Sequence, residues 1–171
     1  MTLTLVLGGA RSGKSAYALE AAQINAAARC AQLVMLATAE GLDAEMKGRI
    51  ARHRAERGPA WRTVEAPLDL PESIAALEPA EAAVVDCLTL WVSNLMMREM
   101  DVEAGGKALL ASLTASRLPI WIVSNEVGLG IVPDNALARK FRDDCGRLHR
   151  QIAALADHVV MLVAGLPLTL K

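Results

Sequence analysis

The sequence has little cysteine, almost no net charge and no apolar run long enough to cross a bilayer. Its three cysteines are odd in number and far apart, which argues against a disulfide framework or a zinc site. We expect Cys30, Cys87 and Cys145 to be small buried residues in a reducing cytoplasm. A net charge of −1 provides no basic field for binding nucleic acid. The longest apolar stretch, 159–170, is interrupted by glycine and proline, which predicts two short strands joined by a turn.

The sequence does contain a complete phosphate-loop motif. Residues 8–15 match G-x-x-x-x-G-K-[ST], with an apolar segment at 3–7 before them and helix-forming residues at 16–22 after them. In such a strand–loop–helix unit, the loop N–H groups and the helix N-terminus face an anion. Lys14 can then reach the β- and γ-phosphates, and the Ser15 hydroxyl can bind Mg²⁺. We therefore predict that a nucleotide binds to Gly8, Gly9, Ala10, Arg11, Ser12, Gly13, Lys14 and Ser15.

Short apolar runs alternate with longer helical stretches, which predicts one α/β domain over residues 1–171 with a mostly parallel sheet. We expect strands at 2–7, 33–37, 82–86, 119–124, 158–163 and 168–170, with an edge piece at 61–64. We expect helices at 14–27, 41–57, 70–77, 88–98, 103–115 and 135–156, with a loop over 98–106 and Asp134 as the last N-cap. Because the chain enters a strand at once, we expect no signal peptide and a cytoplasmic enzyme.

Polar residues follow several of these predicted strands. In an open parallel sheet, ligands bind at the carboxyl ends of the strands. Asp86 follows an apolar run, as a Walker-B carboxylate does when it helps to hold Mg²⁺; capping the next helix is the alternative. Glu65 could accept hydrogen bonds from a ribose or a base edge, or be a plain loop residue. The apolar loop 127–133, with two glycines and a proline, indicates close backbone packing or a lid.

His53 is the unusual histidine, because it continues an apolar stripe that begins at Leu42 along the predicted helix 41–57. One interpretation is a partly buried ring that closes the stripe, with the neighbouring arginines as a solvated face. The other is a neutral imidazole near phosphates that acts as a base or a nucleophile. We expect His149, beside the apolar stripe of the last helix, to be exposed, and both His149 and His158 to be structural.

Taken together, these residues resemble the bifunctional adenosylcobinamide kinase / adenosylcobinamide-phosphate guanylyltransferase family of cobalamin biosynthesis. The resemblance runs nearly end to end, includes the block 86–94 and is most specific in the block 124–133. The phosphate loop, the stretch 49–54 and this block are specific in combination. It implies a RecA-like P-loop fold, a homotrimer and two reactions. Adenosylcobinamide is phosphorylated by ATP or GTP, and GMP is then transferred from GTP to that phosphate through a GMP-histidine that matches His53.

The resemblance also implies nucleotide contacts beyond the loop, at Ala37, Thr38, Ala39, Arg54, Glu65 and Asp86. His149 stands where relatives often carry asparagine, and Arg52 where some carry a second histidine. Two other classes of protein stay open. One is a single-activity P-loop kinase or nucleotidyltransferase for another small cofactor, and the other is a non-catalytic GTP-binding module.

Overall fold

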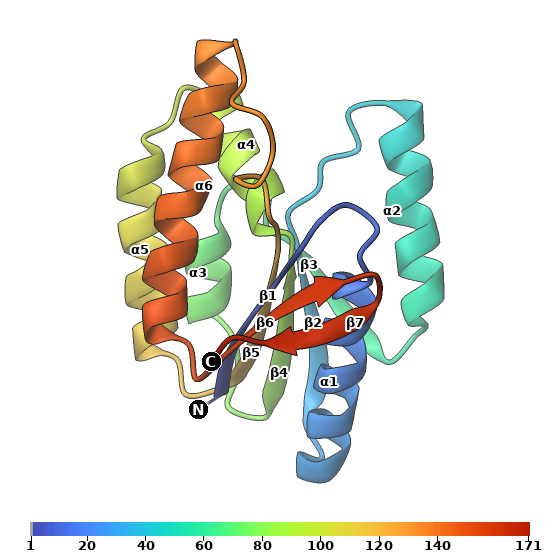
Figure 1. The fold of residues 1–171 in the computed structure, drawn as a ribbon. Helices are drawn as coiled ribbons and strands as arrows, with labels where there is room; N and C mark the ends of the chain where they lie inside the picture. The colour runs from blue at the N-terminus through green and yellow to red at the C-terminus, as the bar shows by residue number, and fades with distance from the viewer. Residues whose placement is uncertain (1) are drawn as a thin grey trace.

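A seven-stranded sheet forms the centre of the computed structural model, which describes residues 2–171 without the side chains of Arg49 and Glu56 (Figure 1). The strand order is β3-β2-β4-β5-β1-β6-β7, and only the edge strand β7 runs antiparallel to its neighbour. The strands are β1 (Thr2–Gly8), β2 (Gln32–Ala37), β3 (Trp61–Glu65), β4 (Glu81–Asp86), β5 (Pro119–Asn125), β6 (His158–Val163) and β7 (Leu166–Thr169). The predicted α/β class with a mostly parallel sheet is confirmed.

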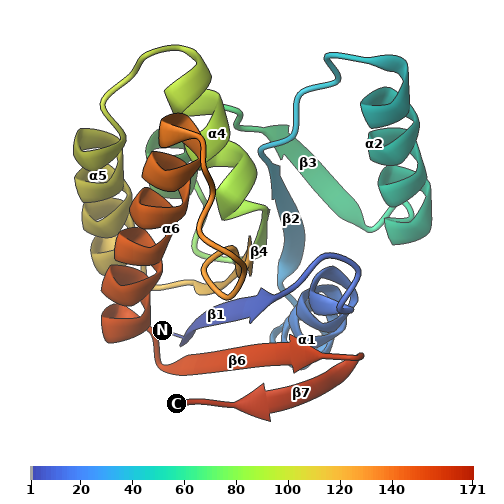
Figure 2. The ribbon, with the colours of Figure 1, turned by 45° about the horizontal axis from the view of Figure 1, so that its top comes forward.

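Helices cover both faces of the sheet (Figure 2). They are α1 (Lys14–Arg29), α2 (Ala44–Arg57), α3 (Leu70–Ala75), α4 (Leu88–Met97), α5 (Val102–Ala115) and α6 (Ala136–Leu155). α1 packs on one face through alanines spaced four residues apart, and α3 to α6 pack on the other face. α2 stands apart from the other helices, beside β2 and β3. Among the described residues, no helix combines the length and apolarity needed to cross a membrane.

The parallel strands are apolar along their length because both of their faces are covered. In β4, Ala83 and Val85 belong to the hydrophobic core under α3 to α6, while Val84 packs in the second core with α1. This double burial produces the uninterrupted apolar runs that predict the strands. It also leaves polar side chains mainly at the carboxyl ends of the strands, where the functional residues were expected.

The C-terminal stretch forms a hairpin, as predicted. β7 covers Leu166–Thr169, two residues earlier than expected, and pairs with β6 across a turn at Ala164 and Gly165. The N–H of Gly165 donates to the carbonyl oxygen of Ser12 at 3.1 Å. The hairpin turn therefore rests against the phosphate loop.

The start of α2 differs from the prediction. The helix begins at Ala44 because the Asp43 side chain caps it, accepting a hydrogen bond from the backbone N–H of Met46 at 2.7 Å. Leu42 lies outside the helix and is 82% exposed, so it does not belong to the apolar stripe. Met46 and Ile50 remain on the face with His53, and all three line one pocket.

Two further boundaries and one cysteine were predicted wrongly. The expected loop 98–106 ends early, because α5 starts at Val102 and includes Gly105, where an added Cβ would lie 3.0 Å from Leu95. Asn135, not Asp134, caps α6 by accepting from the N–H of Ala138 at 3.1 Å. Cys30 is exposed at the end of α1, whereas the other two cysteines are buried as predicted.

Candidate active site

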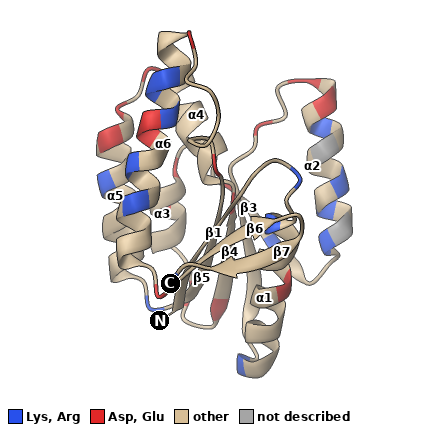
Figure 3. Cartoon of the chain, in the orientation of Figure 1, with Lys and Arg blue, Asp and Glu red and all other residues tan. Residues whose placement is uncertain are grey.

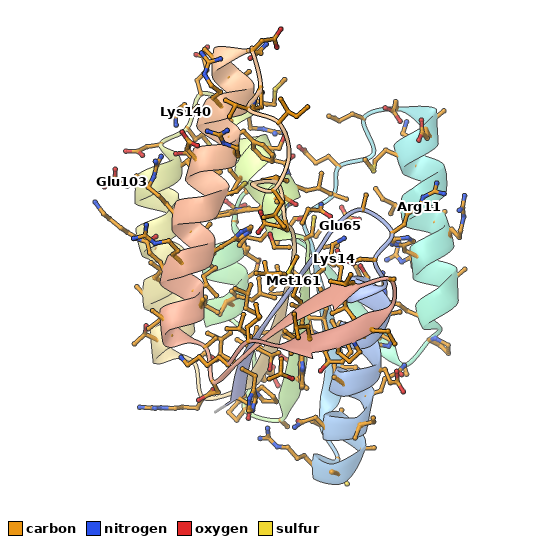
Figure 4. The ribbon with its side chains drawn as sticks, viewed as in Figure 1. Arg11, Lys14, Glu65, Glu103, Lys140 and Met161 are labelled. Carbon is orange, nitrogen blue, oxygen red and sulfur yellow. The ribbon has the colours of Figure 1, made fainter. Side chains whose placement is uncertain are left out.

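A pocket of about 680 Å³ lies between α2 and the carboxyl ends of β2, β3 and β4. It brings together residues that the sequence placed on separate elements, namely Ala37, Ala39, His53, Arg54, Glu65 and Asp86. His53 and Asp86 are half-buried, and Glu65 is exposed at the rim. Figure 4 shows Arg11, Lys14 and Glu65 grouped at the same end of the sheet. The pocket therefore joins the predicted histidine to the predicted strand-end carboxylates.

The phosphate loop lies between β1 and α1, and its residues are not among those that line the pocket. Gly8 must lack a side chain, because an added Cβ would lie 2.4 Å from the Ser12 hydroxyl oxygen and 2.8 Å from the Leu162 carbonyl oxygen. Gly13 adopts a left-handed conformation with φ +93° at the N-cap of α1. A glycine N-cap offers no side chain to the first N–H groups of the helix, so these donors stay available to an anion.

Lys14 and Ser15 lie in the first turn of α1. The Lys14 ammonium donates to the carbonyl oxygen of Gly9 at 2.9 Å and is largely buried. Its charge also acts on the thiol of Cys87, which lines the pocket. The backbone N–H of Glu126 donates to the Gly8 carbonyl at 3.0 Å. These contacts connect the loop to the ends of β4 and β5.

Arg57 is a pocket residue that the sequence analysis did not select. Burial lowers the pKa of its guanidinium below the ordinary value, and the Asp86 carboxylate acts in the opposite direction. Arg57 and Asp86 both line the pocket, and their charges interact. The i, i+4 spacing between His53 and Arg57 is the signal that could have found it. Basic side chains recur along α2 (Figure 3), which gives this wall of the pocket a positive charge.

Thr38 has a supporting position beneath the pocket. It is fully buried, its hydroxyl donates to the Cys87 carbonyl at 2.7 Å, and it accepts from the Cys87 N–H at 2.8 Å. The Asn94 side chain donates to the carbonyl oxygens of Thr38 and Pro67, at 2.8 and 3.0 Å. Thr38 and Asn94 thus fix the ends of β2 and β4 relative to α4. Asn94 was not predicted as a site residue, because its role depends on contacts between distant segments.

Cys87 and Asp86 occupy the turn between β4 and α4. Cys87 is the N-cap residue of α4, so the alternative role of Asp86 as the cap is excluded. Burial, followed by the Asp86 charge, raises the pKa of the Cys87 thiol. A thiol that stays protonated at neutral pH is a poor nucleophile. The Cys87 thiol is therefore a weak candidate for the nucleophile, a role that the sequence analysis predicts for His53.

His149 is buried, which contradicts the predicted exposure. Only 7% of the residue is exposed, and its Nε2 lies 2.7 Å from the Ser124 hydroxyl oxygen. The buried stripe of α6 is wide enough to include His149, which lies four residues after Cys145 and three before Ile152. His158 is exposed at the start of β6, outside the pocket. In the loop 127–133, Leu129 and Ile131 are 79% and 98% exposed, so their side chains are not closely packed.

The donor set in this region fits Mg²⁺. Among the described residues, no group of three histidine, cysteine or acidic side chains could cage a metal ion. The Ser15 hydroxyl and the Asp86 carboxylate are hard oxygen donors at the loop and at the end of β4. Mg²⁺ is usually held by one or two protein oxygens together with substrate phosphates and water. Two oxygens beside a phosphate loop meet that requirement.

Comparisons with known proteins place the chain among close relatives. Residues 4–170 match the family described as cobinamide kinase / cobinamide phosphate guanyltransferase. The bifunctional adenosylcobalamin biosynthesis protein CobP of Pseudomonas aeruginosa is 44% identical over 170 residues, which cover 98% of this chain and 96% of that protein. The corresponding protein CobU of Escherichia coli is 38% identical over 185 residues, with 99% of each chain covered.

Among solved structures, an ATPase domain has a TM-score of 0.53 and 12% identity, covering 94% of this chain and 68% of that chain. This likeness concerns the fold alone and confirms the predicted RecA-like P-loop architecture. The family match and the two relatives span nearly the whole sequence. The chain therefore belongs to the cobinamide kinase / cobinamide phosphate guanyltransferase family and is an enzyme of cobalamin biosynthesis.

Proposed function

We propose that this chain catalyses two successive reactions on adenosylcobinamide. A nucleoside triphosphate, ATP or GTP, first phosphorylates the aminopropanol hydroxyl, and GMP is then transferred from GTP to that phosphate. The observation that supports this proposal is the pocket that His53, Arg54 and Arg57 of α2 line together with Asp86 and Glu65. The charge of Lys14 in the phosphate loop acts on Cys87, which lines the same pocket. One site thus offers both a phosphate cradle and a nucleophile.

The phosphorylation step depends on the positioning of the nucleotide and the substrate and on the stabilisation of charge on the phosphates. The loop N–H groups and the Lys14 ammonium hold the β- and γ-phosphates while the substrate hydroxyl oxygen attacks the γ-phosphorus. As the new oxygen–phosphorus bond forms, the bond from the γ-phosphorus to the β-phosphate oxygen breaks, the nucleoside diphosphate leaves, and the hydroxyl proton passes to solvent. Ser15 and Asp86 would hold Mg²⁺, which would supply neutralisation of charge on the phosphate oxygens. This step needs no covalent bond to the protein, so His53 is not required as a nucleophile.

In the guanylyl transfer, a neutral His53 imidazole attacks the α-phosphorus of GTP. A nitrogen–phosphorus bond forms, and the bond to the pyrophosphate oxygen breaks. A phosphate oxygen of adenosylcobinamide phosphate then attacks the same phosphorus and releases the imidazole. Arg54 and Arg57 stabilise the charge that develops on the phosphoryl oxygens, and Glu65 accepts hydrogen bonds from the ribose or the guanine.

Other parts of the proposal rest on the resemblance and on composition. We expect a homotrimer, a cytoplasmic location and no nucleic-acid partner, the last because the net charge is only −1. Sedimentation equilibrium measures the oligomeric state directly.

The substitution His53→Asn separates the two reactions. With α-labelled GTP, we expect the variant to lose the acid-labile, alkali-stable label on the protein and the synthesis of adenosylcobinamide-GDP. We expect it to keep at least part of the phosphorylation activity, because that step uses the phosphate loop. The matched control is His158→Asn, which changes an exposed histidine outside the pocket and should behave as the wild type.

Two results would contradict this proposal. If His53→Asn still forms the labelled adduct, the nucleophile is another residue. If both activities disappear while circular dichroism shows a folded protein, His53 organises a shared nucleotide site instead of acting in one step.

A further inference from the structure

The carboxyl end of β5 carries a buried polar pair. Ile120 and Ile122 of β5 pack in the core under α3 to α6, and Ser124 is the next residue on the same face of the strand. Its hydroxyl oxygen lies 2.7 Å from Nε2 of His149 on α6. Ser124 is fully buried and His149 nearly so. A hydrogen-bonded pair therefore replaces apolar packing at the end of β5 nearest to the active site.

Three consecutive residues at this point are tied to three different elements. Ser124 is bonded to α6, and the Asn125 side chain donates to the Thr89 hydroxyl of α4 at 3.0 Å. The Glu126 N–H donates to the carbonyl oxygen of Gly8, the first residue of the phosphate loop. Asn125 also lines the pocket. The end of β5 thus links α6 and α4 to the loop that cradles the nucleotide.

We infer that His149, acting through Ser124, is a positioning residue that holds the end of β5 against the phosphate loop. The space on the Cβ side of Gly8 is filled by Ser12 of the loop and Leu162 of β6, so we expect a displacement of the Glu126 N–H to be passed through Gly8 to the loop. Displacements of about 1 Å in a catalytic constellation can lower the rate by up to about 100-fold. His149 does not touch the pocket, so its effect on the nucleotide is indirect.

The electrostatic surroundings keep the pair of Ser124 and His149 in one protonation state at neutral pH. Burial lowers the pKa of His149, and the Glu126 carboxylate acts in the opposite direction. Cys145, one turn earlier on α6, has its pKa raised to about 12 by burial, Asp144, Cys87 and Glu126. The His149 imidazole and the Cys145 thiol are therefore both neutral at pH 7. A neutral imidazole has one N–H and one lone pair, so its Nε2 can hydrogen-bond to the Ser124 hydroxyl.

The test compares four single variants and one double variant of the full chain. His149→Leu and Ser124→Ala each remove one partner, and His149→Gln keeps an amide group at a similar reach. Ile152→Ala is the matched control, because it loosens the same helix by removing an apolar side chain from the core. The measurements are amide hydrogen exchange at Glu126, and kcat and KM for GTP in both half-reactions.

We expect faster exchange at Glu126 in His149→Leu and Ser124→Ala. We also expect kcat/KM for GTP to fall by about 10- to 100-fold, with recovery to within about 3-fold in His149→Gln. The double variant Ser124→Ala/His149→Leu should be no worse than either single variant, since both remove the same bond. Ile152→Ala should lower the melting temperature while the kinetic constants of the folded protein stay close to wild type.

The inference is overturned if exchange at Glu126 is unchanged in His149→Leu, or if Ile152→Ala changes kcat/KM as much as His149→Leu does. It is also overturned if His149→Gln is no better than His149→Leu. The kinetic part rests on the proposed function, whereas hydrogen exchange does not. If the wild-type chain shows no GTP turnover, the proposed function fails, and the exchange comparison still decides the role of His149.

Discussion

At the scale of single residues, the pocket combines carboxylates with the basic residues of α2. The Asp86 charge acts on Arg57 and offsets part of the effect of its burial. Burial raises the pKa of the neighbouring Cys87, and the Asp86 charge raises it further. Asp86 therefore has two effects in the pocket, balancing the arginine and helping burial to keep the thiol protonated. Its third, proposed, effect is to hold Mg²⁺ opposite Ser15.

The substitution Asp86→Asn tests that third effect. It keeps the shape of the side chain and removes the charge, so we expect the Mg²⁺ concentration for half-maximal activity to rise by roughly 10- to 100-fold. Turnover at saturating Mg²⁺ should also fall. A Mg²⁺ titration of both half-reactions measures the effect, with Asp143→Asn, which changes an exposed carboxylate on α6, as the control. An unchanged Mg²⁺ dependence would remove Asp86 from the metal site.

The roles of the candidate site residues stay predictions, and the sequence selected these residues in different ways. The phosphate loop stood out by its motif and Asp86 by its place after a strand, whereas His53 was chosen through the family resemblance, because its spacing alone left a structural role open. The sequence did not indicate Arg57, Asn94 or the buried state of His149, because each depends on contacts with a distant segment. The apolar pattern of one helix cannot show how much of the surface of that helix other elements cover.

At the scale of elements, the local sequence predicted whether a segment is a helix or a strand better than it predicted the residues at which the segment begins and ends. The strands were predictable because helices cover both faces of the sheet, which demands continuous apolar runs. Helix starts were less predictable, because capping by Asp43 and Asn135 selects one of several polar residues in a row. Gly105 lies inside α5 because the helix approaches Leu95 closely there, and tertiary packing outweighs the low helix propensity of glycine.

The phosphate loop offers a matched pair of substitutions at this scale. Gly8→Ala places a Cβ against the Ser12 hydroxyl and the Leu162 carbonyl, so we expect it to destabilise the fold by about 1–3 kcal/mol. At Gly9 an added Cβ meets nothing within 4 Å, and Gly9→Ala should change stability by less than about 0.5 kcal/mol. Urea unfolding of the two variants measures the difference. Equal losses of stability would show that the loop can relax around Gly8.

The buried His149, at the contact between β5 and α6, should make the free energy of unfolding depend on pH. Because burial lowers the pKa of His149, the unfolded chain binds a proton there more readily than the folded protein. Unfolding then takes up a proton below the ordinary histidine pKa of about 6.5, so the free energy of unfolding falls as the pH drops below that value. Above it, His149 contributes no pH dependence.

Urea unfolding at pH 7.5 and pH 5.5 measures this effect in the wild type and in His149→Gln. We expect the difference in unfolding free energy between the two pH values to be smaller in the variant, because glutamine does not titrate. The carboxylates and the other histidines are common to both proteins and cancel in the comparison. An equal difference would mean that His149 titrates alike in the folded and unfolded states.

At the scale of the whole molecule, the site is assembled from both ends of the chain. The phosphate loop follows β1, the pocket uses the ends of β2 to β4 and α2, and the hairpin turn of β6 and β7 touches Ser12. The order of strands in the sheet brings β1 between β5 and β6. A ligand that bridges the loop and the pocket therefore contacts segments that separate when the sheet unfolds.

Nucleotide binding should consequently stabilise the entire fold. A ligand that binds only the folded state at about 100 times its Kd adds about 2.7 kcal/mol to the free energy of unfolding. For a chain of this size, that increment corresponds to a rise in Tm of roughly 5–11 °C. Thermal unfolding with and without GTP and Mg²⁺ measures the shift. Lys14→Ala should lose most of the Tm shift, because the ammonium next to Gly9 no longer reaches the phosphates, whereas His158→Ala should keep the shift.

If saturating GTP leaves the wild-type Tm unchanged, the loop does not bind GTP in the folded protein. If Lys14→Ala retains the full shift, the nucleotide binds elsewhere, and the assignment of the phosphate loop as its cradle is wrong.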